Sequence, residues 1–332
     1  MLKPLIYMTY APPDAAIITN NPVDGNGTST PYGNGPPSTP PPTKFVDAGT
    51  DGGNVRHLDA STLVLVGTFV TPNGDAVKSL VYDGTYIYAG TLSSRVPNSK
   101  VYQIDPSTMT LVGTFTPPDA VSVNALTYDG TYIYAGVDVY VYQIDPSTMT
   151  LVGTFTMSVG NTVNALTYDG TYIYAGTSGT TELYQIDPST MTLVGTFVTP
   201  GGNSVEALTY DGTYIYAGTS LDHIYQIAPS TMTLVGTYTT PGKHSVLALI
   251  YDGTYIYAGT SGSHVYSIDP STLNLIGIFT APDSGSVYSL TYNGIYVYAG
   301  TSKYHVYQIN LPIMTLGETY TASSIINALT TD

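Results

Sequence analysis

The stretch VNALTYDGTYIYAG at residues 123–136 decides the fold of this chain, because close copies of it recur along the sequence. Its last five residues, YIYAG, recur with at most one change, and the copies begin at Tyr86, Tyr132, Tyr172, Tyr214, Tyr255 and Tyr296. The spacings are 46, 40, 42, 41 and 41 residues, and a degenerate copy, FVDAG, begins 41 residues before Tyr86. Seven copies of this length are typical of a propeller, a solenoid or another repeat array.

Each copy contains four runs with the composition of β-strands. In the third copy they are residues 123–128, 131–136, 141–144 and 149–155. Their β-branched and aromatic residues alternate with others, which favours strand over helix. Asp-Gly joins the first two runs and suits a tight hairpin, whereas Asp-Pro-Ser-Thr joins the last two and suits a type I turn. No stretch has a helical period.

Four antiparallel strands repeated seven times predict an all-β protein, a seven-bladed β-propeller. The two ends of the repeat region support a closed ring. Residues 325–330 have the pattern of a lone first strand, whereas residues 45–50, 55–58 and 63–69 match strands two, three and four. We therefore expect a composite blade in which residues 325–330 pair with the strand that contains residues 45–50. Such a ring has no free sheet edge at its seam.

The pattern VNALTYDGTYIYAG followed by VYQIDPSTMTLVGTF resembles the YVTN-type β-propeller repeat, which is common in surface-layer and other cell-surface proteins. The likeness covers residues 45–332 and lies in the Asp-Gly turn, the Tyr-Ile-Tyr strand and the Ile-Asp-Pro-Ser-Thr turn. It implies a propeller and no catalytic residues. The heavy use of tyrosine and the near-identity of the copies depart from the family. Such a fold serves many unrelated functions.

The composition narrows the class of protein. Eight Lys and Arg stand against 23 Asp and Glu, for a net charge of −15, so no basic patch is expected and a nucleic-acid partner is disfavoured. Without cysteine, disulfides, thiolate metal sites and a cysteine nucleophile are excluded. The 32 tyrosines either pack between blades, with their hydroxyls reaching water or backbone, or form a surface that binds sugar or protein.

Residues 1–44 differ from the repeats, and we expect an extended anchoring arm and linker. Residues 31–44 are rich in Pro and Gly and could span roughly 40 Å as polyproline. The apolar segment before them is too short and too interrupted by proline to cross a membrane or to act as a signal peptide. The propeller flank or a neighbouring molecule could hold it, and we favour the neighbour. The expected partner-binding residues of this arm are Leu2, Leu5, Ile6, Tyr7, Tyr10, Ile17 and Ile18.

Propeller geometry sorts the loops onto two faces. The turns between strands one and two, and between three and four, repeat the same residues from copy to copy. The connections on the other face differ in length and content. Variable loops on a rigid scaffold are common binding sites, although unconstrained drift would give the same pattern. The candidate residues of this variable face are Arg95, Asp138, Asp222, Lys243, His244, Lys303 and Tyr304.

The sequence gives little sign of chemistry. His223, His264 and His305 hold one position in three successive copies, just before the third strand. Equivalent positions of adjacent blades lie on the order of 10 Å or more apart, too far for one zinc ion, so we expect exposed histidines that bind no metal. One position of the innermost strand holds neither a ring of carboxylates nor a set of histidines. Its residues in successive copies are Lys78, Asn124, Asn164, Glu206, Leu247, Tyr288 and Asn327. We expect no catalytic residues, no cofactor and no metal.

Two hypotheses about function follow from these observations. In the first, the chain is a structural and interaction protein of a virion or extracellular surface: a decoration, spike or tail component that the arm holds on a larger assembly. In the second, it is a cell-surface or secreted adhesive propeller that binds glycan or protein through its variable loops. A propeller enzyme is a third and weaker hypothesis, because no cluster of carboxylates is visible.

Overall fold

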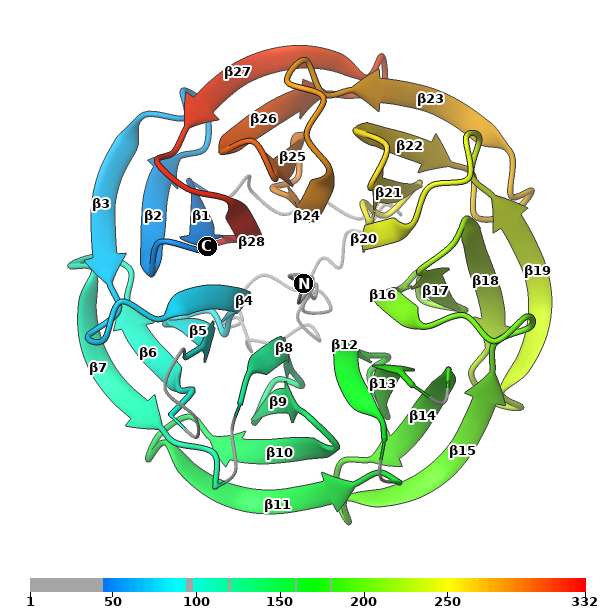
Figure 1. Ribbon diagram of the computed structural model, residues 1–332, viewed down its shortest axis with the longest axis horizontal. Helices are drawn as coiled ribbons and strands as arrows, with labels where there is room; N and C mark the ends of the chain where they lie inside the picture. The colour runs from blue at the N-terminus through cyan, green and yellow to red at the C-terminus, as the bar shows by residue number, and fades with distance from the viewer. Residues whose placement is uncertain (1–43, 94–97, 119–120, 159, 180) are drawn as a thin grey trace, which may run out of the picture.

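The computed structural model describes residues 44–93, 98–118, 121–158, 160–179 and 181–332. Seven four-stranded antiparallel sheets stand around a ring, and the first strand of each lies innermost (Figure 1). The described residues contain no helix, and so they contain no helix that is long and apolar enough to cross a membrane. The predicted seven-bladed β-propeller is confirmed.

The blades are numbered in chain order after the closing blade, which is built from both ends of the repeat region. The closing blade contains β28 (Ile326–Thr331), β1 (Phe45–Thr50), β2 (Asn54–Asp59) and β3 (Leu65–Val70). Blade 2 contains β4 (Ala76–Tyr82), β5 (Ile87–Leu92), β6 (Val101–Asp105) and β7 (Thr110–Phe115). Blade 3 contains β8 (Val123–Tyr128), β9 (Ile133–Val137), β10 (Tyr140–Asp145) and β11 (Thr150–Thr156). Blade 4 contains β12 (Thr162–Tyr168), β13 (Ile173–Ser178), β14 (Glu182–Asp187) and β15 (Thr192–Val198). Blade 5 contains β16 (Val205–Tyr210), β17 (Ile215–Thr219), β18 (His223–Ala228) and β19 (Thr233–Thr239). Blade 6 contains β20 (Val246–Tyr251), β21 (Ile256–Thr260), β22 (His264–Ile268) and β23 (Leu275–Thr280). Blade 7 contains β24 (Val287–Tyr292), β25 (Tyr296–Thr301), β26 (His305–Asn310) and β27 (Thr315–Thr321).

The closing blade has the predicted composition. β28 pairs antiparallel with β1, so that Val46 lies opposite Thr331 and Gly49 lies opposite Ala328. The strand begins at Ile326, one residue later than the sequence pattern suggests. Figure 1 shows β28 as the innermost strand of this blade, beside β1. The last strand therefore takes the place that β4 and its equivalents take in the other blades.

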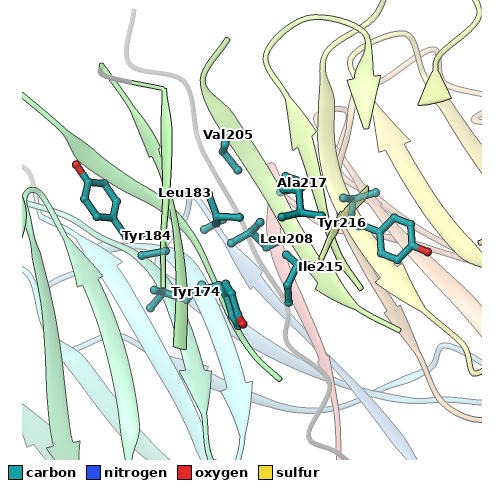
Figure 2. Close-up of a cluster of buried hydrophobic side chains, with 14 of the residues drawn as sticks. Tyr174, Leu183, Tyr184, Val205, Leu208, Ile215, Tyr216 and Ala217 are labelled. Atoms are coloured by element: carbon teal, nitrogen blue, oxygen red, sulfur yellow. The ribbon is translucent and has the colours of Figure 1, made fainter. Parts of the chain in front are cut away.

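Apolar side chains fill the space between neighbouring blades. Figure 2 shows Tyr174 and Leu183 of blade 4 packed towards Val205, Leu208 and Ile215 of blade 5. The glycine of each Tyr-Ile-Tyr-Ala-Gly strand permits this contact: a Cβ on the glycine at position 176 would lie 2.4 Å from the Val205 side chain. The second tyrosine of this strand is fully buried in six blades, as expected for packing between blades: Tyr88, Tyr134, Tyr174, Tyr216, Tyr257 and Tyr298.

A repeated hydrogen-bond chain, here called the Asp–Tyr–Gln network, joins each of blades 2 to 5 to the blade that follows it. In blade 3 the Tyr134 hydroxyl donates to Asp129 Oδ2 at 2.7 Å and accepts from Gln143 Nε2 at 2.8 Å. Gln143 Nε2 also donates to the carbonyl oxygen of Pro188 at 3.0 Å, in the β14–β15 turn of blade 4. Blades 2, 4 and 5 repeat this arrangement. Buried polar groups are thereby satisfied across the blade interface.

Candidate binding face

The constant face of the propeller consists of the turns between strands one and two and between strands three and four. Each of its aspartates Asp129 and Asp145 accepts hydrogen bonds from its own turn. Asp129 Oδ1 accepts hydrogen bonds from the backbone of Thr131 and Tyr132, each at 2.7 Å. Asp145 Oδ1 accepts from the Ser147 hydroxyl at 2.7 Å, and bonds of this kind hold the pKa of the Asp145 carboxyl below its usual value. These side chains shape the turns themselves.

The other face, here called the candidate binding face, consists of the connections between strands two and three and from strand four to the next blade. Hydrogen bonds join these loops across blade boundaries. The Ser245 hydroxyl donates to the carbonyl oxygen of Ser220, and the Val163 amide donates to that of Asp138 at 2.8 Å. The Tyr266 hydroxyl donates to the carbonyl oxygen of Pro241 at 2.8 Å. The loops therefore form one connected surface with a different side-chain set in each blade.

The predicted residues of this face divide by exposure. Lys243, Lys303 and Tyr304 are exposed, and Tyr304 retains 45% of its accessible surface. Asp222 is buried, with Oδ1 2.9 Å from His223 Nδ1. Asp138 is half-buried, and burial raises the pKa of its carboxyl. Lysine and tyrosine side chains are thus available to a partner, whereas the two aspartates are used within the fold.

The remaining residues predicted for this face are His244 and Arg95. His244 is half-buried and its ring stacks near that of His264, with centroids 6.1 Å apart. Arg95 lies outside the described residues. The arm also lies outside them, and with it the predicted partner-binding set Leu2, Leu5, Ile6, Tyr7, Tyr10, Ile17 and Ile18.

The three equivalent histidines begin a strand rather than precede it, and they are half-buried rather than exposed. His223, His264 and His305 each stack on the tyrosine two residues later, with ring centroids 5.4–5.6 Å apart. Within the described residues they join no group of three potential metal ligands. Stacking on these tyrosines explains why the three histidines are partly buried. The sequence did not indicate this, because different residue types occupy the position in different copies.

Asp283 is a polar centre of this face that the sequence reasoning missed. It accepts hydrogen bonds from the Gly285 amide, the Thr301 hydroxyl and His305 Nδ1, all at 2.8 Å. Burial acts to raise the pKa of the Asp283 carboxyl, but these bonds outweigh it and hold that pKa below its usual value. The carboxylate thereby fixes the loops before β24 and β26 to each other.

The inner-strand position that runs from Lys78 to Asn327 contributes contacts between blades. The first strands of blades 2 to 7 have a β-bulge at or next to this position. There the side-chain amides of Asn124 and Asn164 donate to the carbonyl oxygens of Val163 and Val205 in the next blade. These amides are therefore used in packing of the ring and are not free for a ligand.

Comparisons with known proteins support the fold. No family model matches the chain, and no curated protein matches it. Among solved structures, the crystal structure of the computationally designed Ika8 protein has a TM-score of 0.67 and 15% sequence identity, over 87% of this chain and 88% of that chain. In all, 1688 chains of known structure match, and so broad a likeness at low identity shows the propeller fold alone.

Proposed function

We propose that this chain is a non-enzymatic structural and interaction protein, a propeller displayed on a larger assembly such as a virion, where it is a decoration, spike or tail component. In this proposal residues 1–44 hold the chain on the assembly, and the candidate binding face points outward towards a host-surface protein or glycan. The contrast between the two faces carries the proposal: one face repeats its turns, and the other differs from blade to blade.

The hydrogen bonding of the two faces gives this contrast a physical meaning. On the constant face, Asp129, Asp145 and their equivalents are occupied by their own turns. On the candidate binding face, Lys243, Lys303 and Tyr304 stand exposed on loops that neighbouring blades hold in place. A loop backbone that is already held in place loses little conformational freedom on binding, which favours recognition.

Exposed apolar residues on the outer strands of the ring favour contact with neighbouring molecules in an assembly. The fourth strands expose an aliphatic residue at one equivalent position in six blades: Val66, Val112, Val152, Val194, Val235 and Ile276, each with about half of its surface accessible. Apolar surface gains about 25 cal/mol per Å² when it is covered. Only 9% of the residues are charged, so the rim has few charges to oppose close packing.

The repeat pattern favours the YVTN type, and with it an alternative place on a cell surface or as a secreted adhesive propeller. Stacked histidine and tyrosine rings behind the candidate binding face, with Tyr304 exposed in front, favour sugar or protein recognition in that setting. Aromatic rings with a polar group are common in such contacts.

Two preparations test the proposal. Mass spectrometry of purified native particles should find the chain as a stoichiometric component. In parallel, residues 45–332 and the full-length chain should melt at similar temperatures, but only the full-length chain should co-sediment with the assembly. Normal incorporation of the truncated chain, or its failure to fold, would contradict the anchoring role of residues 1–44.

Variants of the candidate binding face test the outward role. Lys243→Ala and Tyr304→Ala should weaken attachment to host cells or to an immobilised glycan array without changing the melting temperature. Thr131→Ala, an exposed substitution on the constant face, is the matched control and should leave attachment unchanged. Equal attachment by all three variants would exclude these loops as the binding surface.

A further inference from the structure

The closing blade has other residues than blades 2 to 5 at the positions of the Asp–Tyr–Gln network. Asp47 and His57 face each other across β1 and β2, as Tyr134 and Gln143 do across β9 and β10. Asp332 directly follows β28, at the position where blades 2 to 6 have an aspartate after their first strand. Two carboxylates and an imidazole therefore replace one carboxylate, a phenol and an amide.

These three side chains are close together and poorly satisfied. Their potential metal-ligating atoms all lie within 4.8 Å of one another, and His57 Nδ1 is 2.8 Å from Asp47 Oδ1. Asp47 is completely buried, and His57 retains only 4% of its surface. Asp47 Oδ2 and Asp332 Oδ1 are buried without a hydrogen-bond partner. Burial raises the pKa of the Asp47 carboxyl to about 6, although the hydrogen bond and charge of His57 act to lower it.

A pocket of about 480 Å³ gives access to this cluster from between the closing blade and blade 2. His57 and Asp332 lie in its wall, together with Phe45, Thr68 and Ser107. A pocket with hydroxyl groups in its wall can hold water beside the cluster. The ring of Phe45 stacks on that of His57, with centroids 4.2 Å apart, and so fixes the orientation of the imidazole.

We propose that Asp47, His57 and Asp332 bind one divalent first-row transition-metal ion, for which Zn²⁺ is the best match, with water on the pocket side. Imidazole nitrogen and carboxylate oxygen are ordinary zinc ligands, and three protein ligands leave a further position for water. A dication would compensate both carboxylates and use their unpartnered oxygens.

The origin of the ligands gives the site a structural role. Asp47 comes from β1, His57 from β2, and Asp332 from the end of β28. One ion would connect the last strand to the first two strands of the ring, which are separated from it by almost the whole propeller. Because binding requires the closed ring, metal binding and ring closure are coupled.

The same residues could instead form only a buried ion pair between Asp47 and His57. That arrangement leaves Asp332 Oδ1 and Asp47 Oδ2 buried without a hydrogen-bond partner, so we favour the metal site. The two cases differ in their response to added metal.

The test uses untagged full-length protein, dialysed against a chelator and titrated separately with ZnCl₂, MnCl₂ and CaCl₂. Calorimetry should show one Zn²⁺ per chain. At about a hundredfold excess over Kd, the melting temperature should rise by about 3–6 °C. The absence of any Zn²⁺ response, or a response to Ca²⁺ in place of Zn²⁺, would overturn the proposal.

Variants assign the ligands. Asp332→Asn, at the end of the last strand, should retain the fold and weaken Zn²⁺ binding at least tenfold. The double variant Asp47→Tyr with His57→Gln restores the residues of blades 2 to 5, and its melting temperature should not respond to Zn²⁺. The matched control replaces three other histidines with asparagine (His223, His264 and His305), and it should respond as the parent does. Unchanged binding in Asp332→Asn or in the double variant, or loss of binding in the control, would refute the assignment.

Discussion

Replacing Tyr134 with phenylalanine tests whether the Asp–Tyr–Gln network stabilises the propeller. The ring is completely buried, and Tyr134→Phe retains its packing while removing only the hydroxyl. Burial, with the adjacent Asp129, raises the pKa of this hydroxyl, so it stays protonated and donates to the carboxylate at 2.7 Å. The variant also removes the acceptor of Gln143 Nε2, which lies 2.8 Å away.

The expected loss follows from these two contacts. A hydrogen bond to a charged group contributes about 1.5–3 kcal/mol and a neutral one about 1 kcal/mol. Asp129 is half-exposed and regains water, and Gln143 retains its bond to Pro188, so the sum lies near the lower end. We expect a loss of about 2 kcal/mol in the free energy of unfolding, or about 3–4 °C in melting temperature for a ring of this size.

The matched control is Tyr132→Phe in the same turn and strand, where the tyrosine is half-buried and its hydroxyl makes no hydrogen bond with another described residue. Its melting temperature should fall by less than about 1 °C. Differential scanning calorimetry of both variants and the parent measures the difference. Equal shifts in melting temperature for the two variants would show that the hydrogen bonds of the Tyr134 hydroxyl do not stabilise the propeller.

Three further predictions concern the ring and the candidate binding face. Deletion of residues 325–332 removes β28 and exposes the edge of β1, so the protein should aggregate or lose well over 5 °C in melting temperature; a monomer that melts like the parent would contradict the closure. Asp283→Asn should lower stability at pH 7 by about 1 kcal/mol. Because the folded pKa of Asp283 is lowered, its stabilisation exists above the unfolded pKa of about 3.9 and is lost as pH falls through the folded pKa. The difference between parent and variant in urea melts should therefore shrink below about pH 4, and a constant difference would exclude the carboxylate as its cause. Replacing His223, His264 and His305 together with asparagine should change the melting temperature by only a few degrees and leave any bound metal in place; loss of a bound metal would place the metal site at these histidines.

The sequence was sufficient for the architecture because each blade is specified by local signals that recur. Asp-Gly and Asp-Pro-Ser-Thr turns fix which runs pair, and their repetition fixes the number of blades. The unmatched first strand at one end and the three strands at the other fixed the closure. The turn signals act within about 45 residues, and the closure needs only a comparison of the two ends of the repeat region, so both can be read without knowing how the blades face one another.

The contacts between blades could not be predicted in the same way. Gln143 reaches Pro188, which lies 45 residues later, and only the tilt of neighbouring blades brings the two together. The stacking of His305 on Tyr307 depends on which face of β26 is half-buried, which a single varied position does not show. The hydrogen bond from the Asn124 amide, next to a β-bulge, to the carbonyl oxygen of Val163 in the next blade likewise depends on how the two blades face each other.

The sequence predicted which strands form the closing blade, here called the seam, but not the cluster of ionisable side chains in it. The sequence nevertheless contained a signal for that cluster. In the degenerate copy FVDAG, Asp47 occupies the position of a buried tyrosine, and His57 of the same copy occupies the position of a glutamine. Random loss of a repeat pattern would favour neutral replacements, because a buried charge without compensation is costly. Two ionisable residues that face each other, with Asp332 beside them from the far end of the ring, therefore distinguish the seam chemically from the interfaces of blades 2 to 5. A closing blade whose strands come from both ends of the propeller gains most from a bond between those ends, and a bound cation would supply it there.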